Sequence, residues 1–284
     1  MKRFSYKPLM YLLVLLFTLV SLQAEENATT PSDAIRIMPL GDSITYDNRE
    51  ADLHDPRPAS TRTGYRSHLW YMLQDAKYGA DFVGSRVAGQ AIKPPFDPDN
   101  EGHPGWTSLD IAEKTYDYMV HSQPDIVLLH IGTNDHGTFA GDVDRILNEI
   151  NYYEQASGKK VHVIVAQIID RRDHDRLIPL FNDNVKKVVA SHVMAGDFVT
   201  MVDMYHDAHL TRGDYADNTH PNDQGYYKMA TVWFNALMTP YNQALNAFPY
   251  SLVPSAELIE SISINDTATS VTITTKVPES GILF

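Results

Sequence analysis

The sequence of 284 residues contains no cysteine, which excludes disulfides, thiol nucleophiles, zinc thiolate sites and thiol redox chemistry. Positive charge is also scarce, because 23 Lys and Arg face 36 Asp and Glu and leave a formal net charge of -13. Such a surface disfavours nucleic acid and anionic membranes, and it favours neutral or cationic partners. With 43% hydrophobic residues and no internal repeat, the chain has the composition of one well-packed globular domain with additions.

A membrane-spanning apolar run is missing as well. The longest run, from Leu9 to Val20, covers about a dozen residues, whereas a bilayer needs roughly 20. Lys2, Arg3 and Lys7 precede this run and the small-residue stretch "SLQA" follows it, which is typical of a signal peptide. We therefore predict cleavage after Ala24, a secreted protein (extracellular or periplasmic) without membrane association, and a charge that changes from -13 to -16. A single membrane anchor is the alternative.

Short runs rich in Val and Ile alternate with segments of helical spacing through most of the chain. The runs predict strands at 35–40, 81–84, 125–131, 161–169 and 198–203. The segments between and after them predict helices at 65–78, 108–120, 142–156, 177–195 and 223–237. Strands buried on both faces and joined by helices indicate a parallel sheet. The expected fold class is α/β, a three-layer α/β/α sandwich around a central parallel sheet of about five strands.

The domain organisation follows from changes in composition. We expect a linker at 25–34, a catalytic domain at 35–248 and a β-rich tail at 249–284, in which Thr, Val and Ile alternate. The tail is predicted to begin a truncated β-sandwich module, with a strand docked on the main domain as the alternative. Two long polar connections, 47–63 and 85–104, follow strand ends, where open α/β sheets bind ligands, so we expect them to wall a cleft.

The stretch "IRIMPLGDSITY" places a serine directly after the first predicted strand. Gly41 permits a tight turn, and Ser43 would then lie at a helix start with its hydroxyl at the cleft and its N–H available to an oxyanion. Asp and Ser are also preferred helix caps, so a purely structural role is the alternative. A serine hydroxyl is a weak nucleophile at neutral pH and requires a base.

Two Asp-x-x-His pairs are candidates for that base. Asp217 and His220 in "DNTHPNDQGYY" precede the last predicted helix, where one turn can orient the imidazole and leave its other nitrogen free for a serine proton. Asp203 and His206 in "DMYH" have the same spacing and remain a competitor. With Asp207 and His209 this second group also resembles a metal site, but exposed His and Asp are more often solvated. We predict neither a metal site nor an organic cofactor.

Acyl transfer further needs donors for the tetrahedral oxyanion. Asn134 in "HIGTND" follows the third predicted strand and carries a side-chain amide, and Gly132 lets this turn approach the cleft. Gly105 in "EGHPGW" offers a backbone N–H, with Gly84 in "DFVGS" as a second candidate. Gly105 is preferred because one helix and one strand fit between it and Asn134.

The four blocks that hold Ser43, Gly105, Asn134 and the Asp217–His220 pair occur in the order typical of SGNH hydrolases, and the chain resembles this superfamily of GDSL-type esterases. The resemblance implies a flavodoxin-like fold, Ser43 as nucleophile, and His220 as base oriented by Asp217. It also implies an oxyanion hole formed by the Ser43 and Gly105 amides and the Asn134 side chain.

Within the superfamily, residues 35–237 are most similar to carbohydrate esterase family three, whose members include acetyl xylan esterases. This implies a secreted serine esterase that removes acetyl groups from a polysaccharide through an acyl-enzyme. Relatives commonly place glycine shortly after the serine block, whereas this chain has Tyr46, which puts the acyl group in question. Residues near the motifs that we expect to bind the substrate are Asp42, Tyr46, Tyr65, His103 and Trp106.

Two alternatives remain open at this point. The same fold can serve a lipid, an aryl ester or a thioester. The chain could also be a carbohydrate-binding protein that has lost turnover on a hydrolase scaffold, although the presence of all four blocks argues against this.

Overall fold

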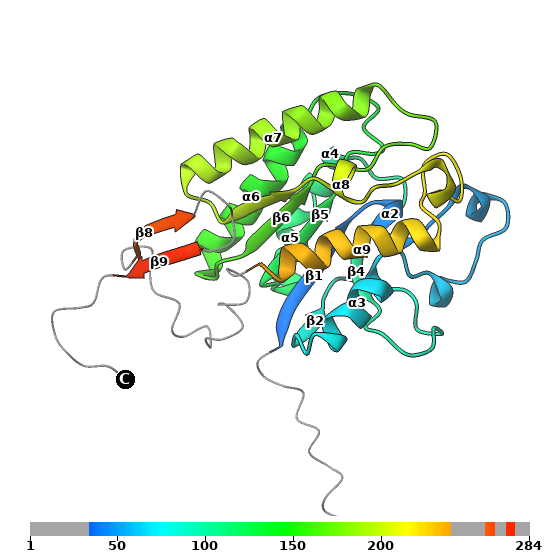
Figure 1. Cartoon of the computed structure of the whole chain (residues 1–284), viewed down its shortest axis with the longest axis horizontal. Helices are drawn as coiled ribbons and strands as arrows, with labels where there is room; N and C mark the ends of the chain where they lie inside the picture. Colours follow the sequence, from blue (N-terminus) through cyan, green and yellow to red (C-terminus); the bar gives the residue numbers. More distant parts are fainter. Residues whose placement is uncertain (1–33, 240–258, 265–270, 276–284) are drawn as a thin grey trace, which may run out of the picture. The chain divides into compact units, whose positions relative to one another are not determined.

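The computed structural model describes residues 34–239, 259–264 and 271–275 (Figure 1). The predicted signal peptide and the predicted linker up to residue 33 lie outside the described residues. Within the described part of the chain, no helix has both the length and the apolar character needed to cross a membrane.

The five predicted strands are present and run parallel. Each pairs with a neighbour in the order expected for a sheet built from strand–helix–strand units, so the predicted fold class is confirmed. They are β1 (Ile35–Gly41), β2 (Ala80–Phe82), β5 (Ile126–His130), β6 (His162–Ala166) and β7 (Val199–Val202).

Two further strands correct the expectation that 85–104 is only a loop. β3 (Arg86–Val87) and β4 (Asp99–Gly102) form an antiparallel pair, and β4 lies parallel to the end of β1. The sheet is therefore mixed, with the order β3-β4-β1-β5-β6-β7, while β2 pairs with the beginning of β1. The sequence "DNEG" of β4 gave no strand signal because Asp, Asn and Gly are depleted in strands.

The helices agree with the predicted segments except for one. The segment 108–120 divides into α4 (Ser108–Ala112) and α5 (Thr115–Ser122), and the Thr115 hydroxyl donates to the carbonyl of Ile111 at 2.9 Å across the break. The other long helices are α3 (Arg66–Asp75), α6 (Gly141–Ser157), α7 (Leu177–Ala195) and α9 (Asp223–Leu237). Short ones are α2 (Ser43–Tyr46), α8 (Met204–Asp207), η1 (Glu50–Leu53), η2 (Ala59–Thr61) and η3 (Arg212–Asp214).

The sheet has a hydrophobic core on each face. Along β1, Ile35 and Ile37 pack with residues of α3 and α9, whereas Met38 and Leu40 pack with residues of α4, α5, α6 and α7. This alternation is the two-residue period of a strand, and it places α3 and α9 on one side and the other long helices on the opposite side (Figure 1). The three-layer arrangement is thus built from strands that are apolar on both faces.

The carboxyl end of β1 lies in register with two neighbours. Gly41 is opposite Gly102 of β4 and opposite His130 of β5. A Cβ on Gly41 would lie 2.2 Å from the carbonyl oxygen of His130, so only glycine permits this approach. The segments that follow these three residues consequently start at the same edge of the sheet.

The tail contains two strands, β8 (Ile259–Ile264) and β9 (Val271–Thr275), which pair antiparallel with each other. They agree with the β-structure expected there. The module to which they belong, and the domain boundaries at 248 and 249, stay predictions.

A buried arginine connects the segments around the end of β1. Arg66 has 0% exposure, and its guanidinium donates to four backbone carbonyls, those of Thr45, Ala88, Pro98 and Arg62, at 2.9 to 3.2 Å. Burial lowers the pKa of Arg66 to about 10, so the side chain remains charged at neutral pH. The charge is compensated by carbonyl dipoles, which makes Arg66 the point at which α2, β4 and the connection after α2 are held together.

Replacing Arg66 with methionine would remove the side-chain donor from the carbonyls of Thr45, Ala88 and Arg62, whereas the Pro98 carbonyl would keep the Ala88 amide and Asn100 Nδ2. We expect Arg66→Met to lower the free energy of unfolding by at least about 2 kcal/mol, measured by urea unfolding, because buried orphan acceptors cost roughly 1–3 kcal/mol each. Arg145→Met is the control, since Arg145 is half-exposed and pairs only with Asp142 on the surface of α6. Its effect should stay within about 0.5 kcal/mol, and equal effects of the two variants would contradict the role given to Arg66.

Candidate active site

Ser43 is the first residue of α2, and Asp42 is the residue that caps this helix. The Asp42 carboxylate accepts from the amide of Ile44 at 2.9 Å, and Ser43 has 5% exposure. Because Asp42 satisfies the capping role, the Ser43 hydroxyl is not needed for it. The Ser43 amide belongs to the first turn, where an N–H has no partner inside the helix and can bind an anion.

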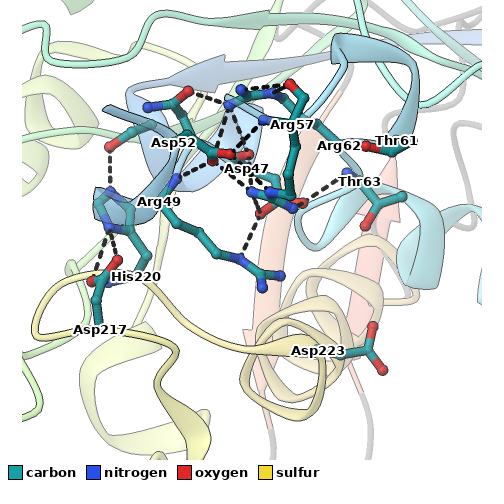
Figure 2. Close-up of polar contacts among 12 residues, drawn as sticks. Asp47, Arg49, Asp52, Arg57, Thr61, Arg62, Thr63, Asp217, His220 and Asp223 are labelled. Atoms are coloured by element: carbon teal, nitrogen blue, oxygen red, sulfur yellow. Dashed lines mark hydrogen bonds and ion pairs between the residues drawn. The ribbon is translucent and has the colours of Figure 1, made fainter. Parts of the chain in front are cut away.

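The hydroxyl of Ser43 meets the imidazole of His220. The distance from Ser43 Oγ to His220 Nε2 is 2.9 Å, and His220 Nδ1 lies 2.9 and 3.0 Å from the two carboxylate oxygens of Asp217 (Figure 2). The structure therefore brings together three predicted residues from the two ends of the domain. In this chain of contacts the imidazole can take the serine proton on one nitrogen while its other nitrogen donates to the carboxylate.

Asp217 is held by backbone amides as well as by the histidine. Its Oδ1 accepts from the amides of Thr219 and His220 at 2.8 and 2.7 Å, and its Oδ2 accepts from the amide of Glu50 at 2.8 Å. Partial burial works against ionisation, but the bond with His220 and these three amide bonds outweigh it and keep the pKa of Asp217 well below its ordinary value. A carboxylate at neutral pH can stabilise the imidazolium that forms when His220 takes a proton.

The two predicted oxyanion donors are connected to each other. Asn134 Nδ2 donates one hydrogen to the carbonyl of Trp106 at 2.8 Å, which orients the amide group and leaves its second hydrogen for another acceptor. Gly105 precedes Trp106 and has a φ of +82°, a conformation that favours glycine. Asp135 fixes the same two segments, because it accepts from the amide of Ser108 at 2.8 Å and from the Ser108 hydroxyl.

The second candidate glycine, Gly84, has a structural role. A Cβ at Gly84 would lie 2.1 Å from the carbonyl oxygen of Asn100 in β4, so glycine is required for close packing after β2. Gly105, in contrast, has no atom within 4 Å of an added Cβ and lies in the segment that contacts Asn134.

The competing pair is outside this arrangement. Asp203 caps α8 by accepting from the amide of His206 at 3.0 Å, and its other oxygen lies 2.7 Å from His206 Nδ1. The His206 side chain is 71% exposed. No group of three or more His, Asp or Glu among the described residues is arranged to hold a metal ion, so the metal interpretation of this segment gains no support.

Four of the five residues expected to bind the substrate are buried, and three of them, Asp42, Tyr65 and His103, lie beneath other parts of the chain, so their role toward a substrate stays a prediction. Asp42 and Tyr65 both have 0% exposure, and Tyr65 packs in the core against Trp233. His103 has 6% exposure, stacks on Trp106 and Tyr118, and pairs with Glu101 at 2.6 Å. These side chains support the site from behind because the core and the β4 segment cover them.

The other two differ from each other. Tyr46 has 9% exposure, and its ring is covered by the guanidinium groups of Arg86 and Arg62 at 4.5 and 5.7 Å. Trp106 is half-buried at the edge of the site, between the exposed Gly105 and the start of α4. Of the five residues, Trp106 presents the most accessible aromatic surface.

Sequence reasoning did not identify Arg171, which follows β6. Its guanidinium donates to the carbonyl of Thr133 at 2.9 Å and to the hydroxyl of Thr219, so it connects the neighbour of Asn134 with the neighbour of His220. No local pattern marks such a residue, because both partners are distant in sequence and one of them is a backbone group.

The residues of this site fall inside a region that matches a known family model, described as the GDSL-like lipase/acylhydrolase family, over residues 40–228. That region covers more than half of the chain. The chain belongs to this family. The match includes both Ser43 and His220.

Individual relatives of this GDSL-family chain point to esterases. A multidomain esterase of Ruminococcus flavefaciens is 28% identical over 253 residues, which cover 78% of this chain and 30% of that protein. The chain thus spans less than a third of the length of this curated relative. The activity of the whole relative is therefore considered below only as a proposal.

Two solved structures resemble the GDSL-family chain over its catalytic region. A family 3 carbohydrate esterase from Clostridium thermocellum has 27% identity and a TM-score of 0.61, covering 75% of this chain and 98% of that one. A serine-to-alanine mutant of an acetyl esterase, crystallised with an acetate ion, has 28% identity and a TM-score of 0.58, covering 75% and 99%. These likenesses agree with the α/β/α architecture.

The two Asp-x-x-His pairs give a direct test of the geometry. We expect His220→Ala to reduce kcat on p-nitrophenyl acetate at least about 1,000-fold, because His220 is the base that contacts Ser43 among the described residues. His206→Ala should leave kcat within about twofold, since His206 contacts the cap of α8 and the ring of Tyr205, and not Ser43. The opposite pattern would move the base to the earlier pair.

Asp42 makes stability depend on pH. Burial raises the pKa of Asp42 to about 6. The hydrogen bond from the Ile44 amide and the nearby His220 lower the pKa, but their effect is smaller. The folded protein therefore favours the protonated Asp42 carboxyl. The stability that this gives is complete below about pH 4, where the unfolded chain is protonated too, and it is lost as the pH rises through 6.

We therefore expect Asp42→Asn to be more stable than the wild type at pH 7.5, by up to about 3 kcal/mol, and equally stable near pH 4. Asn is a good helix cap, so the bond with the Ile44 amide can be kept. Urea unfolding measured at both pH values checks this, and a difference that does not change with pH would refute it.

Proposed function

We propose that the chain is a secreted serine esterase that removes acetyl groups from a polysaccharide of the acetylated xylan type. The observation that carries this is the continuous set of contacts from Ser43 Oγ through His220 to Asp217, at the sheet edge where Gly105 and Asn134 also lie. Secretion rests on the sequence of residues 1–24 alone.

In the proposed reaction, Ser43 Oγ attacks the acetyl carbonyl carbon while His220 Nε2 takes the hydroxyl proton. The tetrahedral intermediate then collapses, the bond to the sugar oxygen breaks, and His220 returns the proton to that oxygen. Water, deprotonated by the same imidazole, attacks the acetyl-enzyme and releases acetate. Asp217 stays ionised throughout and stabilises the imidazolium.

The oxyanion of both intermediates would be bound by three N–H donors. Two are the backbone amides of Ser43 and Gly105, and the third is the free hydrogen of Asn134 Nδ2. The fixed bond from Asn134 to the Trp106 carbonyl supports this role, because a preoriented donor does not reorganise when negative charge develops.

A carbohydrate ester is supported by the relatives and by the surface of the site. The structures with the likeness reported above include a family 3 carbohydrate esterase and an acetyl esterase with acetate. Trp106 offers a half-buried aromatic face at the rim, which suits packing against a sugar ring. The net charge of -13 also favours a neutral substrate over an anionic one.

A lipid, aryl ester or thioester is the second candidate, because the family description covers lipases and acylhydrolases as well. A carbohydrate-binding protein without turnover is less well supported. The contacts among Ser43, His220 and Asp217 are complete, and such a protein would have no need for them.

The choice can be made with three substrates. We expect the protein to release acetate from acetylated xylan, and to show at least about tenfold higher kcat/KM on p-nitrophenyl acetate than on the octanoate ester, in line with the acetyl esterase that the chain resembles. Ser43→Ala should lose both activities. Preference for octanoate without acetate release from xylan would favour the lipid alternative, and full activity in Ser43→Ala would exclude Ser43 as the nucleophile.

A further inference from the structure

Asp217 receives one hydrogen bond from a segment far from its own loop. The amide of Glu50 donates to Asp217 Oδ2 at 2.8 Å, and the same oxygen lies 2.9 Å from His220 Nδ1. The Glu50 side chain is exposed, so its contribution here is made by the backbone. We name residues 47–63, which include Glu50, the arginine strap.

The position of the Glu50 amide depends on Asp52. Asp52 Oδ2 accepts from the amide of Arg49 at 2.8 Å, which caps the η1 helix that begins at Glu50. Its other oxygen, Oδ1, accepts from both the amide and the Nε of Arg57 at 3.0 Å. Asp52 has 6% exposure, so these bonds form where little water competes.

Ion pairs with neighbouring arginines hold Asp52 in place (Figure 2). Arg57 Nη2 and Arg62 Nη1 donate to Asp52 Oδ2 at 2.8 and 3.2 Å. Arg57 also contacts Asp47, at 3.2 Å, and Asp47 accepts from the amide of Thr63 at 3.1 Å. Two buried carboxylates thus face three guanidinium groups, since Arg49 Nε also donates to Asp47 at 3.3 Å. Burial works against ionisation of Asp52, but the bonds from Arg57 and from the Arg49 amide hold its pKa well below the ordinary value.

We propose that Asp52 is a positioning residue for the catalytic acid, and that it acts by fixing the Glu50 N–H on Asp217 Oδ2. Asp52 itself touches neither Asp217 nor His220 in any contact found in the structure. With the amide in place, Asp217 has a single orientation toward His220. The inference depends on ester hydrolysis at Ser43 and not on the identity of the polysaccharide.

Removing the amide hydrogen tests the contact itself. In Glu50→Pro the donor is lost, and the ring carbon that replaces the hydrogen pushes Asp217 away. The backbone can accept the change, because Glu50 begins a helix, where proline is tolerated, and Arg49 before it is extended, with φ -95° and ψ 164°. Glu50→Ala is the matched control, because it keeps the N–H and removes only the exposed side chain.

Asp52→Asn tests whether Asp52 acts through this contact. We expect Asp52→Asn and Glu50→Pro each to lower kcat on p-nitrophenyl acetate about 10- to 100-fold, with KM within about twofold, because a displaced acid misorients the base without touching the acyl group. The kcat of the double variant should be no lower than that of the more impaired single variant, since both changes break the same link. Glu50→Ala should match the wild type.

A second control separates positioning from general stability. Glu154 of α6 is also a buried carboxylate. It accepts from the amide of Val161 at 2.7 Å and pairs with Lys160, so it contacts the segment before the amino end of β6, away from Ser43. Glu154→Gln should lower the melting temperature as Asp52→Asn does and leave kcat unchanged. The downfield proton resonance of His220 Nδ1–H should shift or broaden in Asp52→Asn and Glu50→Pro, and stay in place in Glu154→Gln.

The proposal is overturned if Glu50→Pro keeps the kcat and the His220 resonance of the wild type. It is also overturned if the losses of the two single variants multiply in the double variant, because Asp52 would then act by another route. If Asp52→Asn does not fold, Asp52→Glu takes its place in the same comparison, because it keeps the charge that faces Arg57 and Arg62 but displaces the carboxylate from the Arg49 amide. A wild-type protein without esterase activity would instead contradict the proposed function, and the His220 resonance would still report on the contact.

Discussion

The backbone pairing at the end of β1 is the constraint on which the site depends. Gly41 lies in register with both Gly102 and His130, and its missing side chain lets the His130 carbonyl approach. Because the three strands end at one level, the segments that carry Ser43, Gly105 and Asn134 begin only a few residues from the same edge. The proposed nucleophile and the proposed oxyanion donors are therefore positioned by the main chain of the sheet, which is more rigid than contacts between surface loops.

Asp217 and His220, the proposed acid and base, are held at this edge by loop contacts. Asp217 and His220 lie in a loop between η3 and α9, and no strand fixes their position. Instead, Arg171 connects Thr219 to the Thr133 carbonyl, and the Glu50 amide contacts Asp217 from the arginine strap. In an acidic protein, the cationic side chains near the site are thus engaged with carboxylates and carbonyls. Because these cations hold loops together, they are not available to bind an anionic group. This agrees with the proposal of a substrate that does not carry strong negative charge.

The sequence was most informative where chemistry and local pattern coincide. Runs of Val and Ile predicted the five parallel strands because burial on both faces requires them, and Asp-x-x-His predicted the pair that meets Ser43. β4 was missed because its Asp, Asn and Gly residues are held by pairing with β1 and not by propensity. The burial of Tyr65 and His103 had no signal either, because an aromatic residue near a motif can face the core or the cleft. The Glu50 contact had no signature at all, since every residue except proline has an N–H.

Tyr46 shows how one departure from the family pattern is accommodated. Gly102 permits its backbone to approach, because a Cβ there would lie 2.7 Å from the Tyr46 amide nitrogen. The ring then lies beneath Arg62 and Arg86 and does not present a free surface to an acyl group. Arg62 in turn contacts Asp52, which caps the helix of the Glu50 amide. A continuous path therefore leads from the helix of the nucleophile through Tyr46 and the arginine strap to the catalytic acid. On this path Tyr46 is linked through Arg62 to the carboxylate of Asp52.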